Sequence, residues 1–181
     1  MTSYTQLFDA EQMMAKVREL AGQIAAQFPE TDKPLALVGI HQVGVPLARL
    51  LHDELVKLGR KSEFGMLDIT MYRDDIGTRN LLPLIHETVI SFDVNDRVII
   101  LVDDVLSTGR TIRAALDALT DYGRPGLIRL AVLVDRGEPE FPIRADFVGF
   151  NAVVPAERKV LVQFDGDDVH PAGIYSVYWD K

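Results

Sequence analysis

The sequence contains no cysteine, which excludes disulfide bonds and thiolate metal sites and gives no argument for export. No stretch approaches about 18 uninterrupted apolar residues, the length a membrane-spanning helix needs. The first residues also lack the cationic patch and apolar core of a signal peptide. The sequence therefore predicts a soluble, cytoplasmic protein with no membrane partner.

Basic residues are few. Lysine and arginine number 19 against 27 aspartates and glutamates, so the formal net charge is −8, which disfavours attraction to a nucleic acid. The four histidines, His41, His52, His86 and His170, are scattered without the spacing of metal ligands. The glycine patterns of a Walker loop and of a dinucleotide-binding turn are both missing from the sequence.

The length of 181 residues and an apolar content of 48% suit one substantial core, so we expect a single domain over residues 1–181. Apolar residues recur at helical spacing over 9–28, 46–58 and 111–122. Apolar runs typical of buried strands occupy 35–40, 66–72, 98–102 and 127–134, with shorter strand-like pieces at 147–150 and 160–164. The pattern predicts an α/β fold with a parallel central sheet flanked by helices.

Ligands of such sheets bind beyond the carboxyl ends of the strands. Three loops that carry glycine or aspartate fall there, at 41–44, 103–111 and 135–137. The segment 73–84 is polar, charged and contains Gly77, so we expect an exposed and mobile arm.

The segment 98–111 is the most informative, because an apolar strand runs into Asp103 and Asp104 and then into Ser107, Thr108 and Gly109 ahead of a helix. Free backbone amides at a helix N-terminus favour an anion such as a phosphate monoester. The two carboxylates would repel that phosphate, so we expect them to address sugar hydroxyls or a cation. Asp104 and Ser107 are at most about 10 Å apart, which is comparable with the length of a ribose phosphate.

The alternative is an ordinary strand-to-helix connection in which Ser107 or Thr108 caps the helix and two acids lie at the rim of the sheet.

The segment 98–111 resembles the phosphoribosyl pyrophosphate signature of type I phosphoribosyltransferases. Further similar segments at 68–75, 118–125, 133–137 and 142–146 narrow the resemblance to the PyrR family of pyrimidine-operon regulators and uracil phosphoribosyltransferases. The resemblance runs from about residue 9 to residue 164. It implies the type I fold with a small hood and a mobile flap, a homodimer or homotetramer, and Mg²⁺-dependent conversion of uracil and phosphoribosyl pyrophosphate to UMP and pyrophosphate.

The resemblance also implies roles for individual residues. Asp103, Asp104 and Arg73 would be catalytic, with the carboxylates at the ribose hydroxyls and Arg73 beginning the flap. Substrate would contact Val105, Leu106, Ser107, Thr108, Gly109, Arg110, Thr111, His41, Gln42, Val43, Arg136 and Val160, with the 5-phosphate at Ser107 to Thr111 and uracil near Arg136 and Val160. No protein side chain is expected to bind Mg²⁺ directly; the ion would be held through the pyrophosphate and the ribose hydroxyls. The competing interpretations are that Arg136 forms a surface ion pair and that Val160 belongs to the core.

Two departures from the family bear on function. Its regulators carry a Lys-Thr-Arg-Gly type loop whose arginine helps hold pyrophosphate, whereas this chain has His41-Gln42-Val43-Gly44. Backbone amides or His41 would have to bind pyrophosphate instead, and weaker binding or loss of transferase activity is the alternative.

Basic positions that bind messenger RNA in the attenuating members are also replaced, by Glu19, Gly22, Gln27, Glu138, Pro139, Glu140 and Phe150, with Arg144 retained. RNA binding is therefore disfavoured. The alternative functions are a UMP-sensing RNA-binding regulator with weak or no catalysis, and a transferase for a purine base.

Overall fold

The computed structural model describes residues 4–30, 34–75, 85–166 and 170–178. Within these ranges the elements follow in the order β1 (Tyr4–Asp9), α1 (Ala10–Gln27), β2 (Leu35–Ile40), α2 (Gly44–Lys57), β3 (Glu63–Leu67), the 3-10 helix η1 (Thr70–Tyr72), β4 (Val98–Leu106), α3 (Arg110–Thr120), β5 (Leu127–Asp135), β6 (Phe147–Asn151), β7 (Arg158–Gln163) and β8 (Gly173–Tyr178).

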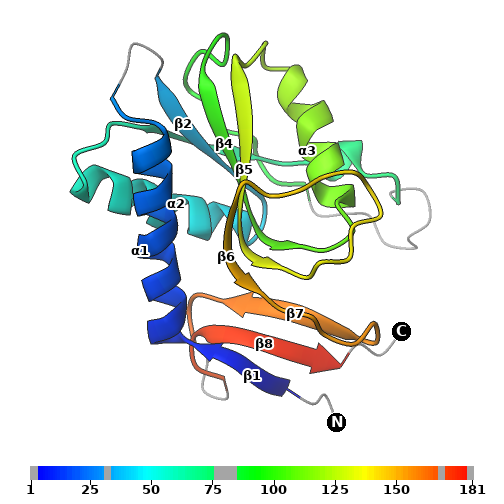
Figure 1. Cartoon of the computed structure of the whole chain (residues 1–181). Helices are drawn as coiled ribbons and strands as arrows, with labels where there is room; N and C mark the ends of the chain where they lie inside the picture. Colours follow the sequence, from blue (N-terminus) through cyan, green and yellow to red (C-terminus); the bar gives the residue numbers. More distant parts are fainter. Residues whose placement is uncertain (1–3, 31–33, 76–84, 167–169, 179–181) are drawn as a thin grey trace.

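The centre of the molecule is a five-stranded sheet in the order β3-β2-β4-β5-β6. Every neighbouring pair of strands in it is parallel (Figure 1). All residues of β2 are buried, as expected for a strand covered on both faces. The predicted α/β class with a parallel central sheet is therefore confirmed.

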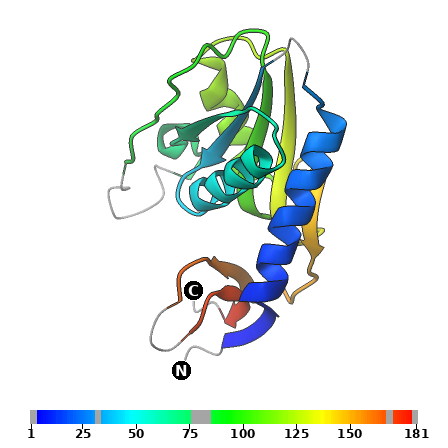
Figure 2. The same ribbon diagram turned by 90° about the vertical axis from the view of Figure 1, so that its left-hand side faces the viewer.

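Helices cover both faces of this sheet. On one face α1 and α2 pack over a cluster that includes Val17, Leu51 and Ile100. On the other face α3 packs over a second cluster that includes Ile99 and Ala115. Figure 2 shows α1 running along the sheet and onward to a second, smaller sheet.

The long helix α1 begins where the sequence indicates, because Asp9 forms a reciprocal cap with Gln12. The amide of Gln12 donates to the Asp9 carboxylate at 2.8 Å, and the amide of Asp9 donates to the Gln12 side chain at 3.0 Å. None of the described helices is long and apolar enough to cross a membrane.

The second sheet has the order β1-β8-β7 and is antiparallel. We call it the hood sheet. Its inner residues Val162 and Ile174 belong to the same apolar cluster as α1 and α2, so the two sheets share a core. The sequence reading missed β1 and β8, because these strands lie at opposite ends of the chain and neither has a long apolar run.

Two predicted boundaries were wrong. The strand expected at 66–72 is β3, which ends at Leu67, because the Asp68 carboxylate accepts the amide and the hydroxyl of Thr70 and turns the chain. The strand expected to end at 102 continues to Leu106, because Asp103, Val105 and Leu106 keep their register with β5. The other predicted helices and strands are confirmed with small shifts of their ends. Residues 76–84 of the predicted arm lie outside the described residues.

Candidate active site

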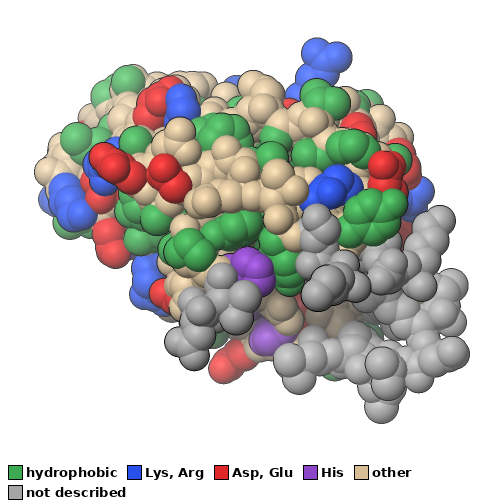
Figure 3. Space-filling view, turned by 90° about the horizontal axis from the view of Figure 1, so that it is seen from below, with side chains coloured by type: hydrophobic (Ala, Val, Ile, Leu, Met, Phe, Trp, Pro, Cys, Tyr) green, Lys and Arg blue, Asp and Glu red, His purple; other side chains and the backbone are tan. Residues whose placement is uncertain are grey.

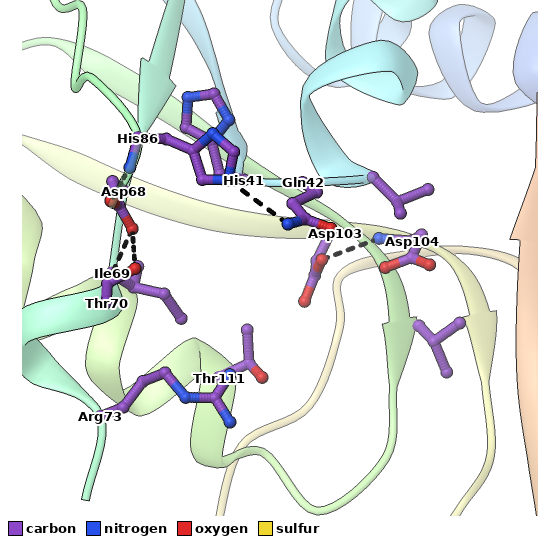
Figure 4. Close-up of a pocket in the computed structure, with 12 residues that line it drawn as sticks. His41, Gln42, Asp68, Ile69, Thr70, Arg73, His86, Asp103, Asp104 and Thr111 are labelled. Carbon is purple, nitrogen blue, oxygen red and sulfur yellow. Dashed lines mark hydrogen bonds between the residues drawn. The ribbon is translucent and has the colours of Figure 1, made fainter. Parts of the chain in front are cut away.

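A cavity of about 460 Å³ lies at the carboxyl ends of β2, β3 and β4. Figure 4 shows its walls. It is lined by His41, Gln42, Val43, Asp68, Ile69, Thr70, Arg73, His86, Asp103, Asp104, Val105 and Thr111. The structure thus brings eight of the predicted site residues, Arg73 among them, to this one cavity.

Asp103 and Asp104 are the carboxylates at the end of β4. Asp103 is buried and Asp104 is half-buried, and the amide of Asp104 donates to the Asp103 carboxylate at 3.0 Å. Burial raises the pKa of Asp103 well above its ordinary value, and the neighbouring Asp104 raises it further. Burial also raises the pKa of Asp104, although hydrogen bonds oppose this shift. The pair therefore favours a bound proton or a nearby positive charge.

The turn from His41 to Val43 forms a second wall, and the glycines on either side of it allow close packing, Gly44 against β4 and Gly39 against α2. A Cβ on Gly44 would lie 2.5 Å from the carbonyl oxygen of Val102, and a Cβ on Gly39 would lie 2.7 Å from the Cα of Val45. Both glycines allow an approach of main chain to main chain that other residues would block. The peptide bond between His41 and Gln42 is cis.

The third wall joins two segments through the carboxylate of Asp68. It accepts hydrogen bonds from the Thr70 amide at 2.8 Å, the Thr70 hydroxyl at 2.5 Å and the His86 amide at 2.6 Å. Burial raises the pKa of Asp68, but these hydrogen bonds outweigh it and hold the pKa below its ordinary value. The carboxylate stays charged and fixes the segment after the arm against the end of β3.

Two histidines stack on this side of the cavity. The rings of His41 and His86 lie 4.8 Å apart and nearly parallel. Nε2 of His41 lies 3.2 Å from the Glu87 carbonyl oxygen, and the Gln42 side-chain nitrogen lies 3.3 Å from Nε2 of His86. The contacts join residues more than 40 positions apart in the sequence.

The loop that follows β4 ends at the N-terminus of α3. Gly109, at φ +89°, is the N-cap of this helix, and no side-chain cap is present. Within the described ranges, the amides of Ser107, Thr108 and Gly109 donate no hydrogen bond to another group. Such free amides at a helix start attract an anion. Ser107 or Thr108 was the cap in the ordinary-connection interpretation, and the structure gives that position to Gly109.

Thr111 lines both this cavity and an adjoining one of about 450 Å³, which is also lined by Arg73, Asp74, Asp75 and Arg110. Arg73 forms a two-point ion pair with Asp75, with both distances 2.8 Å. Arg110 is exposed and pairs with Asp74 at 2.7 Å and with Glu140 at 2.9 Å.

Arg136 and Val160 lie outside the lining of the main cavity. Arg136 is buried and pairs with Glu138 at 3.0 Å, while Val160 is half-buried on β7 against the shared core. Leu106 and Ser107 instead line a smaller cavity of about 290 Å³.

Asp68, Thr70 and His86 line the site although the sequence did not predict them as site residues. The signal for the first two is the segment 68–75, whose resemblance to a family motif covers both residues.

Among the described residues no cluster of three or more histidine, aspartate or glutamate side chains is arranged to hold a metal ion. Mg²⁺ commonly binds through one or two carboxylates together with substrate oxygens. Asp103 and Asp104 on β4 are two such carboxylates.

Comparison with known proteins agrees with this geometry. Residues 3–163 match the family model described as the phosphoribosyl transferase domain. The chain is 46% identical to the bifunctional protein PyrR of Roseiflexus sp., with 95% of this chain and 94% of that protein covered. It is 50% identical to the bifunctional protein PyrR of Thermus thermophilus, with 89% and 93% covered.

Among solved structures, a hypoxanthine-guanine phosphoribosyltransferase from Bacillus anthracis aligns with a TM-score of 0.70 at 20% identity, covering 95% of this chain and 97% of that one. The hypoxanthine phosphoribosyltransferase of Trypanosoma cruzi aligns with a TM-score of 0.69 at 19% identity, covering 98% and 97%. At such identities the likeness concerns the fold alone. The chain belongs to the phosphoribosyltransferase domain family and, within it, to the PyrR proteins.

Proposed function

We propose that this protein transfers the phosphoribosyl group of phosphoribosyl pyrophosphate to uracil and releases UMP and pyrophosphate. One observation carries the proposal: the carboxylates of Asp103 and Asp104 and the N-terminus of α3 follow one another at the end of β4, where the main cavity lies. This arrangement offers hydrogen-bond acceptors for a diol and amide donors for a phosphate within the length of one ribose phosphate.

The donor would lie with its 5-phosphate against the amides of Ser107, Thr108 and Gly109 and the hydroxyl of Thr111. Its ribose hydroxyls would donate to the carboxylates of Asp103 and Asp104. Its pyrophosphate would then point toward the turn from His41 to Val43, on the far side of the same cavity. Gly109 suits the phosphate loop, because its φ of +89° is a conformation that residues with a side chain rarely adopt.

Departure of pyrophosphate leaves positive charge on the anomeric carbon of the ribose. Carboxylates held next to the ribose stabilise that charge more in the transition state than in the ground state. Burial of Asp103 and Asp104 strengthens this effect, because the field of a carboxylate is weakly screened away from water. The raised pKa values imply that the charged form of the pair is costly in its buried surroundings. A positive charge beside the pair lowers this cost.

Mg²⁺ suits this site as a companion of the substrate, and when bound it would neutralise the leaving pyrophosphate. Asp103 and Asp104 would support the ion electrostatically, while the oxygens of pyrophosphate and ribose bind it. Arg73 stands at the edge of the cavity, paired with Asp75 at the start of the segment whose continuation, 76–84, lies outside the described residues. We propose that Arg73 contacts the substrate and helps to exclude water, which competes with the base as a nucleophile.

Membership in the PyrR family supports uracil as the acceptor base, and the core shared by both sheets supports one domain over residues 1–181. The test is to mix purified protein with labelled uracil, phosphoribosyl pyrophosphate and Mg²⁺ and to measure UMP. Hypoxanthine and guanine, offered under the same conditions, test a purine transferase on this scaffold. Formation of UMP alone supports the proposal, and formation of only a purine nucleotide contradicts it.

A second candidate is a UMP-sensing RNA-binding regulator of pyrimidine genes, which the relatives' description as bifunctional favours. The charge distribution opposes it. Glu138 pairs with Arg136 and Glu140 pairs with Arg110, so acidic groups occupy the surface after β5. On the face seen in Figure 3, the described Lys and Arg side chains are interspersed with Asp and Glu. Binding to its own pyrimidine leader transcript that is strengthened by UMP and weakened by salt would establish this role.

A further inference from the structure

The main cavity has little positive charge for a ligand as anionic as pyrophosphate. Its described lining contains three carboxylates, those of Asp68, Asp103 and Asp104, and one guanidinium, that of Arg73. Asp75 already holds Arg73 through two hydrogen bonds of 2.8 Å.

Nearby arginines do not supply the missing positive charge. Arg110 binds Asp74 and Glu140 and lies outside the lining of this cavity. Arg113 binds Asp117 and the Tyr72 carbonyl oxygen. Among the described residues of the lining, the side chains that remain able to carry a positive charge are His41 and His86.

These histidines are built into one unit. Their rings stack at 4.8 Å with an angle of 9° between the planes, and both line the cavity. His86 is held at its main chain, because its amide donates to the ionised Asp68 at 2.6 Å. Figure 4 shows both rings on the same side of the cavity as Gln42, with Arg73 and Thr111 on the other side.

The chemistry of the partner atoms indicates which ring nitrogen donates and which accepts in the structure. A carbonyl oxygen only accepts, so Nε2 of His41 donates to Glu87. The side-chain nitrogen of Gln42 only donates, so Nε2 of His86 accepts in this contact. If the amide of Gln42 rotates by half a turn, its oxygen accepts from Nε2 of His86 instead. The Gln42 amide can therefore pair with Nε2 of His86 whether or not that nitrogen carries a proton.

Two protonated rings this close repel each other. An anion bound beside the pair offsets this repulsion and favours protonation of the rings. Among the described residues, the charged groups that line the cavity with the pair are Asp68 after β3, Arg73 after η1, and Asp103 and Asp104 on β4, and the Glu87 carbonyl oxygen contacts His41.

We infer that His86, stacked on His41 and hydrogen-bonded to Gln42, supplies the positive charge that binds the pyrophosphate of the phosphoribosyl donor. The inference rests on the proposed function for the identity of the ligand. It makes His86 a binding residue that follows the arm in the sequence. It makes Asp68 a positioning residue that acts through the His86 main chain. Pyrophosphate binding is then accompanied by uptake of a proton.

The test uses calorimetric titration of the full chain with magnesium pyrophosphate, which needs no acceptor base. For His86→Gln we expect about tenfold weaker binding near pH 6 and a smaller difference from wild type near pH 8, because a histidine beside the bound anion can take up a proton and a glutamine cannot. Comparison with the variant at each pH removes the titration of pyrophosphate itself, which is common to both proteins. Titration in buffers of different ionisation enthalpy should show fewer protons taken up by the variant.

A second variant guards against a general defect. His86→Lys carries a permanent charge, so we expect it to bind magnesium pyrophosphate at least as tightly as wild type near pH 8. His52→Gln is the control, because His52 binds Ser62 at 2.9 Å and lies outside the cavity. UMP affinity should stay within about twofold of wild type in all three variants, since UMP carries no pyrophosphate.

Pyrophosphate affinity and proton uptake that are unchanged in His86→Gln would overturn the inference, as would wild-type protein that binds no magnesium pyrophosphate. A protein that shows the predicted dependence on His86 but accepts hypoxanthine in place of uracil would support the inference and contradict the proposed function, so the two failures are distinguishable.

Discussion

Gly44, the first residue of α2, lies so close to Val102 that a Cβ on it would be 2.5 Å from the Val102 carbonyl oxygen and 3.1 Å from the Cα of Asp103. The atoms it would meet belong to the main chain of a buried strand, which cannot turn aside as the end of a flexible side chain does. This approach fixes the distance between the turn from His41 to Val43 and the carboxylates on β4.

Gly44→Ala should therefore lower both stability and activity. We expect a loss of about 1–3 kcal/mol in the free energy of unfolding, typical of forcing extra atoms into a packed site. Urea denaturation measures it, alongside the UMP assay. Gly22→Ala in α1 is the control, because a Cβ there meets nothing within 4 Å. Alanine favours a helix, so this variant should gain up to about 1 kcal/mol. Equal effects of the two substitutions would contradict the close approach.

Asp103→Asn should make the protein more stable at neutral pH while it removes activity. Burial raises the pKa of Asp103 well above 3.8, so the stability contributed by this group is full below about pH 3.8 and is lost as the pH rises through the raised value. Asparagine is neutral throughout, so the advantage of the variant should grow as the pH rises through the raised pKa of Asp103 and be greatest at neutral pH.

The measurement is the difference in unfolding free energy between variant and wild type across that pH range. Asp53→Asn on the exposed face of α2 serves as the control for removal of one carboxylate from the surface. A variant that is less stable than wild type at every pH would show that the buried charge of Asp103 does not lower the stability of the protein.

Asp104→Asn should reduce turnover by about 10²-fold or more without lowering the melting temperature. The side chain is half-buried at the end of β4, and burial raises its pKa, so a neutral side chain of the same shape is no less stable there. Steady-state kinetics and thermal denaturation decide the matter. Parallel losses of melting temperature and activity would indicate a structural role instead.

Thr111→Val removes one hydroxyl from the first turn of α3 and keeps the shape of the side chain. If this hydroxyl donates to the 5-phosphate, UMP should bind about tenfold more weakly, as for a lost hydrogen bond to a charged group. Thr120→Val at the other end of α3 is the control, because the Thr120 hydroxyl donates to the Asp117 carbonyl and the residue lies outside the cavity lining. Calorimetric titration with UMP measures both, and unchanged affinity in Thr111→Val would remove Thr111 from the phosphate site.

Much of the central sheet and of the site was predictable, because the information is local. The apolar run of β4, the acid pair and the small residues before α3 are adjacent in the sequence, and the periodicity of α1 and its cap at Asp9 lie within one segment. The resemblance to a family rested on the same contiguous segments.

The rest depends on contacts between distant parts of the chain. The hood sheet pairs β1 with β8 from opposite ends of the chain. His41 and His86 stack although the arm lies between them in the sequence. Gly109 takes the cap position that the alternative interpretation gave to Ser107 or Thr108, and its φ of +89° suits a residue without a side chain. Neither pattern nor propensity in one segment reports such contacts.

The structure of the protein crystallised with UMP tests the central claim most directly. We predict that the phosphate lies within hydrogen-bond distance of the amides of Ser107, Thr108 and Gly109, and that the ribose hydroxyls donate to Asp103 and Asp104. Clear density for UMP elsewhere, with these amides bound to water, would contradict the account.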